Sequence, residues 1–189
     1  MSQTIKMRKS AGVIAASVAL AVLAPLSAQS AFAQASSAEV GSPQLSPADQ
    51  KFVEAATMSS STEIDTGKLA QKASDDKDVR KFARHMIMDH TKLTLQLKMA
   101  APKGVKVPKD NTDPAIMSAL QNLKGKEFDQ AYVKQVGVEA HQKTVEAFRD
   151  EIQNGQDAKL KAAAQKALPT IEEHLKMAQD LAKKKGYAQ

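Results

Sequence analysis

The sequence predicts an all-α protein, a four-helix bundle built from two antiparallel helical hairpins that are joined by a long crossover. Three observations support this fold. Apolar residues recur at the 3.6-residue spacing of amphipathic helices in four long segments. Short turns link the first segment to the second and the third to the fourth, which makes each pair antiparallel neighbours. No segment alternates apolar and polar residues as a strand would.

The first 33 residues have the pattern of a secretory signal peptide, not of a folded segment. Lys6, Arg8 and Lys9 precede an apolar stretch over residues 11–26, and Ala31-Phe32-Ala33 follows as a cleavage motif. The stretch is shorter than the ~20 residues of a membrane span, and no cysteine is present to carry a lipid anchor. We therefore expect cleavage after Ala33 and a periplasmic or secreted protein, for which association with the outer membrane is left open.

Composition narrows the classes of function. The chain has 27 basic and 21 acidic residues, and loss of the three basic residues of the signal leaves 24 against 21. A balance of +3 with mixed signs predicts no nucleic-acid partner. The lack of cysteine excludes a disulfide scaffold, a thiolate zinc site and cysteine catalysis. No transmembrane span is expected after signal removal, and the partner and oligomeric state are left open.

The first hairpin is expected to begin after a flexible leader at residues 34–46. Ser46 and Pro47 are typical of a helix start, and the periodicity predicts a helix from about 47 to 73. Acidic residues in the turn at 74–78 favour the start of a second helix, which is expected to last until about 101. Together with the second hairpin, this helix pair forms a predicted bundle domain over residues 47–185.

The crossover at residues 102–126 is rich in proline and is expected to contain a short helix that begins at Pro114. The third long helix is predicted over about 127–153 and the fourth over about 158–184, with a turn at Gly155 between them. Pro169 is expected to kink the fourth helix. A crossover of this length leaves open whether the third helix runs parallel or antiparallel to the second.

Each long helix places one chemically active residue on its inward face: Glu63, His90, His141 and His174. Neutral imidazole and carboxylate are ligands that a bundle core uses for divalent metals. Counted from the turns, Glu63 and His90 lie at nearly the same depth. His141 and His174 differ by three residues, or about 5 Å along a helix. The alternative is structural, because buried polar groups need hydrogen-bond partners and a Glu63–His90 hydrogen bond would supply one without a metal.

Several short segments together resemble the bacterial family called domain of unknown function 4142, whose members are often labelled outer membrane proteins. The resemblance covers almost all of the chain after the signal, and its segments are Glu63, Gly67–Ala70, Val79–Ala83, Asp89-His90, Phe128–Val133, His141, Leu168-Pro169 and His174-Leu175. It implies a ferritin-like four-helix fold and export across the inner membrane, and it supplies no known activity.

The sequence departs from the di-iron proteins of the ferritin-like class. These carry Glu-x-x-His on two helices, whereas the residues three positions before His90 and His174 are Ile87 and Ile171. A di-iron centre is therefore disfavoured, and a mononuclear metal site or no metal is expected.

Two functions are predicted for the chain. The first is an exported helical-bundle protein of unassigned biochemical activity that acts as a binding or envelope-stress module and not as a catalyst. The alternative is a divalent-metal-binding protein with a mononuclear site in the bundle core, held by Glu63, His90, His141 and His174.

Overall fold

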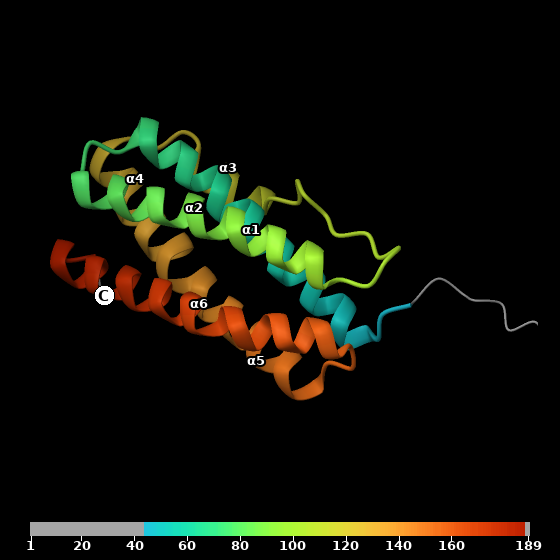
Figure 1. Ribbon diagram of the computed structural model, residues 1–189. Coiled ribbons are helices and arrows are strands. Elements are labelled where there is room, and N and C mark those ends of the chain that lie inside the picture. The colour runs from blue at the N-terminus through green and yellow to red at the C-terminus, as the bar shows by residue number, and fades with distance from the viewer. Residues whose placement is uncertain (1–43, 188–189) are drawn as a thin grey trace, which may run out of the picture. The chain divides into compact units, whose positions relative to one another are not determined.

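The computed structural model describes residues 44–187, and all of the regular secondary structure in that range is helical (Figure 1). The predicted all-α bundle is therefore confirmed. The predicted signal peptide, and the predicted leader up to residue 43, lie outside the described residues. The elements in chain order are α1 (Pro47–Ala73), α2 (Lys77–Ala100), α3 (Pro114–Leu120), α4 (Gly125–Ala131), η1 (Tyr132–Ala140), α5 (His141–Asn154) and α6 (Ala158–Lys185).

Side chains at the helix starts fix these bounds. Ser46 and Asp49 form a capping box at α1, in which each side chain bonds the backbone N–H of the other residue. The carboxylates of Asp76, Asp113 and Asp157 accept hydrogen bonds from the first backbone N–H groups of α2, α3 and α6. Both hairpin turns are therefore short and well defined, as the sequence predicts.

Contacts at the bundle ends settle the helix directions. Asp49 Oδ1, at the start of α1, accepts from the backbone N–H of Gln156 and Asp157 in the α5–α6 turn, at 2.8 and 3.1 Å. Lys185, at the end of α6, donates to Asp76 Oδ2 at 2.6 Å beside the α1–α2 turn. Consequently α6 runs parallel to α1 and antiparallel to α2, and α5 runs parallel to α2, as Figure 1 shows.

The third long helix differs from its prediction in the middle. The helical segment is continuous from α4 to α5, but the nine residues of η1 form a π-helix. π-Helical turns are rare, and those that occur are often found at functional sites. Gly137 of η1 packs tightly on α6, since a Cβ there would lie 3.0 Å from the Cβ of Ala178. Pro169 lies inside α6, which continues through it.

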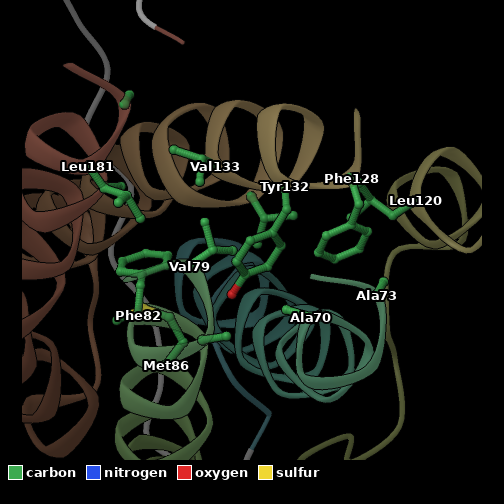
Figure 2. Packing of buried hydrophobic residues seen from close by; sticks show 14 residues of the cluster. Ala70, Ala73, Val79, Phe82, Met86, Leu120, Phe128, Tyr132, Val133 and Leu181 are labelled. Atoms are coloured by element: carbon green, nitrogen blue, oxygen red, sulfur yellow. The ribbon is translucent and has the colours of Figure 1, made fainter. Parts of the chain in front are cut away.

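Two apolar clusters fill the bundle, one at each end of α1. One contains Ala70, Phe82, Phe128 and Tyr132, and Figure 2 shows the Tyr132 ring between the two phenylalanines with its hydroxyl pointing into the bundle. The other is built around Phe52, with members from α1, α2, α5 and α6. Among residues 44–187, no helix is long and apolar enough to cross a membrane.

Candidate metal centre

A buried polar layer separates the two apolar clusters. On α2, for example, His90 lies one turn from Met86 of the first cluster and three residues from Leu93, which packs on the second. The four residues singled out in the sequence all lie in this layer, and each is only 1% exposed: Glu63, His90, His141 and His174. Every long helical segment therefore contributes one of them.

The three histidines form a compact triangle. Their ring centroids are 5.7 Å apart for His90 and His141, 5.3 Å for His90 and His174, and 5.5 Å for His141 and His174. One nitrogen of each ring lies within 4.8 Å of one nitrogen of each other ring. The predicted offset of about 5 Å between His141 and His174 does not separate them, because two imidazole side chains span it.

Each imidazole uses one nitrogen to contact the surrounding protein. His174 Nε2 lies 2.9 Å from Asp89 Oδ2, and His141 Nδ1 lies 3.1 Å from the carbonyl oxygen of Val136. His90 Nδ1 lies 3.3 Å from Ser60 Oγ. A carboxylate and a backbone carbonyl are the groups that commonly hold the second nitrogen of a metal-binding histidine and fix its ring orientation.

The other nitrogen of each ring has no hydrogen-bond partner among residues 44–187. These atoms are Nε2 of His90, Nε2 of His141 and Nδ1 of His174. Leaving a buried polar atom unpaired costs about 1–3 kcal/mol. Three such ring nitrogens within one small layer, beside the two unpaired carboxyl oxygens of Glu63, therefore require a reason. They are the ring atoms not used for outward contacts, and a metal ion bound to all three would satisfy them together.

The electrostatics keep the rings in the form that binds metals. Burial lowers the pKa of His90 well below its ordinary value, and the neighbouring His141 and His174 lower it further. Burial likewise lowers the pKa of His141 to about 4. It lowers the pKa of His174 as well, although the hydrogen bond with Asp89 opposes this effect. The imidazoles are therefore neutral at pH 7, as ligation requires.

Glu63 lies beside the triangle and not within it. Its Oε1 is 3.2 Å from His141 Nδ1, the nitrogen that faces Val136. Burial raises the pKa of Glu63 well above its ordinary value. The carboxyl also lines a groove of about 430 Å³ between α1, α3, η1 and α5. The structure thus places Glu63 against the outward nitrogen of a candidate ligand.

The Glu63–His90 hydrogen bond considered as the structural alternative is absent among residues 44–187. Glu63 faces α5 and contacts His141, whereas the α1 side chain beside His90 is Ser60, one helical turn earlier. Equal depth in a hairpin does not place two residues on the same side of α1, which packs on both α2 and α5.

A comparison with known families identifies the chain. The sequence model of the family described as "Domain of unknown function (DUF4142)" matches residues 34–181. The chain belongs to the DUF4142 family. The resemblance inferred from its short motifs is therefore confirmed, and membership by itself assigns no activity.

The DUF4142 chain is also similar in fold to a crystal structure of a candidate secreted protein, DUF305, from Streptomyces coelicolor. The two chains share 19% sequence identity at a TM-score of 0.57, and the match covers 74% of this chain and 94% of the other. Identity at this level shows the fold alone. A comparison with curated proteins gives no match.

Two features of the candidate site are not evident from sequence patterns. Ser60 and Val136 hold two of the histidines through a hydroxyl and a backbone carbonyl, and neither residue type signals a metal site. The π-helix that contains Val136 has one sequence signal, Gly137 within an apolar helical segment. An isolated glycine in a helix often has a packing or functional reason.

Proposed function

We propose that this protein is exported and binds one divalent transition-metal ion in its core through His90, His141 and His174. The observation that carries the proposal is the set of three unpaired ring nitrogens among the described residues, which belong to rings that also offer nitrogens within 4.8 Å of one another. Export is supported by the signal pattern of residues 1–33 and by the description of the DUF305 structure as a candidate secreted protein.

The donor set defines the class of metal. Imidazole nitrogens suit zinc, copper, nickel, cobalt and ferrous iron, whereas magnesium and calcium take oxygen ligands. In a tetrahedral site with metal–nitrogen bonds of 2.0–2.1 Å, the nitrogens lie about 3.3 Å apart. The separations of up to 4.8 Å therefore need to shrink by at most about 1.5 Å when an ion binds.

Three protein ligands leave one tetrahedral position for water or a small ligand. Glu63 is proposed to orient the His141 ring from outside the triangle, an assignment supported by the 3.2 Å distance between Glu63 Oε1 and His141 Nδ1. This assignment makes Glu63 a positioning residue, and it narrows the predicted set of four ligands to three. We assign no reaction to the site.

Elemental analysis tests the proposal directly. The purified protein is chelated, reloaded with Zn²⁺, Cu²⁺ or Co²⁺, and dialysed. We expect close to one ion per chain for the wild type and none for His90→Ala or His141→Ala. Leu97→Ala is the matched control, because Leu97 is a buried α2 residue of the second apolar cluster that lacks a ligating atom. Equal metal content in the histidine variants and the wild type would refute the site, as would a folded wild type that retains no metal.

A further inference from the structure

One of the three outward histidine contacts reaches solvent. Ser60 is buried, and so is Val136, which holds His141. The side chain of Asp89, in contrast, is 30% exposed while its Oδ2 contacts His174 Nε2 at 2.9 Å. Each ring of the triangle is itself only 1% exposed. Asp89 is therefore the polar contact that links the triangle to the surface.

His85 shares this carboxylate oxygen from the solvent side. Its Nε2 lies 3.6 Å from Asp89 Oδ2, one helical turn along α2, and its side chain is 48% exposed. The rings of His85 and His174 are perpendicular, with centroids 6.3 Å apart. An imidazole, a carboxylate and a second imidazole thus lie in series from the surface to the triangle.

The chemistry of this pair suits a metal ion that is still exchanging. Imidazole and carboxylate are both ligands of divalent transition metals, and residues at i and i+4 lie on one face of a helix. A groove of about 230 Å³ lies beside His85 and leaves room for the remaining water ligands of the ion. Its charged lining is balanced, with Lys81 and Lys184 opposite Asp78 and Asp180. Two protein ligands bind an ion less tightly than three, so an ion bound here can dissociate or be transferred to another ligand.

We propose that His85 and Asp89 form a second, surface metal site through which a divalent transition-metal ion enters and leaves the triangle of His90, His141 and His174. This inference rests on the proposed function of the triangle. An ion held by His85 Nε2 and Asp89 Oδ2 lies beside His174, whose Nε2 already contacts the same oxygen. The His174 ring then rotates about its Cβ–Cγ bond so that its unpaired Nδ1 replaces His85 as a ligand, and it rotates back to carry the ion inward. Its Nε2 keeps its proton throughout, and each step exchanges one ligand without a change of oxidation state.

The surface site of His85 and Asp89, here called the loading site, has a kinetic consequence that distinguishes His85 from the ligands of the triangle. Because His85 contacts the ion during transfer and not in the final complex, His85→Ala is expected to slow binding and release by the same factor. If the substitution raises the transfer barrier by about 1.4 kcal/mol, each rate falls about tenfold. Their ratio, the dissociation constant, is expected to stay unchanged.

Stopped-flow absorption with Co²⁺ alone tests this prediction, because Co²⁺ bound by nitrogen ligands absorbs in the visible range. Binding rates are measured on metal-free protein, release rates by adding excess chelator, and affinity by competition with a chelator. His85→Glu keeps a ligating side chain at the same position and is expected to restore fast exchange. Thr91→Ala, a change at an exposed α2 residue, is the control and is expected to exchange at the wild-type rate.

The outcomes separate the two proposals. Normal Co²⁺ binding with unchanged rates in His85→Ala overturns the loading site alone and leaves the triangle in place. A weaker affinity with an unchanged binding rate also overturns it, since His85 would then stabilise the final complex. If the folded wild type binds no Co²⁺, the proposed function fails, and the loading site fails with it.

Discussion

Replacing the buried His90 with leucine should stabilise the metal-free protein. His90 Nε2 has no partner among the described residues, and such an atom costs about 1–3 kcal/mol. Leucine has a similar size and no polar atom, so His90→Leu removes this cost. The change also gives up the 3.3 Å contact with Ser60. Because a serine hydroxyl in a helix can turn to the carbonyl four residues earlier, this loss costs only about 0.5–1.5 kcal/mol. The expected net gain is about 1 kcal/mol.

Urea denaturation and thermal melting of chelated protein measure this gain. For a domain of this size, 1 kcal/mol shifts the melting temperature by about 2–4 °C. Leu97→Ala provides the scale for ordinary loss of core packing, which costs about 2–5 kcal/mol. Adding Zn²⁺ should raise the melting temperature of the wild type and leave that of His90→Leu unchanged.

The opposite result would refute the reasoning. If His90 is a structural residue with both nitrogens satisfied, its replacement by leucine removes hydrogen bonds and lowers stability. A metal-free His90→Leu protein that is less stable than the wild type by 1 kcal/mol or more, with no zinc-dependent shift in either protein, would show that His90 serves the fold.

Three further outcomes are expected. Asp89→Asn weakens the carboxylate contact to His174 and should lower metal affinity about 10–100-fold, as competition with a chelator would show. Burial and the charge of Asp49 raise the pKa of Glu151 from 4.5 to about 7. The contribution of protonated Glu151 to the free energy of unfolding is therefore complete below pH 4.5, and it is lost as the pH rises through 7. Between pH 5 and pH 8, the free energy of unfolding should therefore fall by about 2–3 kcal/mol less in Glu151→Gln than in the wild type. Urea denaturation at the two pH values measures this difference. Finally, Gly67→Val should destabilise the α1–α2 hairpin by about 1–3 kcal/mol, because even a Cβ at Gly67 would lie 2.8 Å from the Ile87 side chain; thermal melting checks this.

The sequence predicts the fold closely because its signals are local. Periodicity and the caps at Ser46, Asp113 and Asp157 locate the helices to within a few residues, since each signal acts within one helical turn. The direction of the third helix depends on contacts between distant ends of the chain. Asp49 and Gln156 are 107 residues apart, and no local pattern reports such a pair.

The site is predictable in its members but not in its contacts. Histidines on inward faces are visible in the sequence, because they occupy positions where the periodicity expects apolar residues. Which neighbour holds each ring depends on the rotation of the helices about their axes. Asp89 precedes His90 in the chain, yet it holds His174 of α6. The π-helix around Val136 likewise changes the local geometry without a distinct sequence pattern.

The polar layer has a consequence for stability that distinguishes a binding site from a structural network. A structural network satisfies its buried groups within the protein, whereas here each ring is satisfied on its outer side only. A metal ion supplies the missing interactions, and an ion at 100 times its dissociation constant stabilises the folded state by about 2.7 kcal/mol. That gain exceeds the expected advantage of about 1 kcal/mol for metal-free His90→Leu. The order of stability should therefore reverse when metal is added, and this reversal follows only if the unpaired nitrogens are ligands.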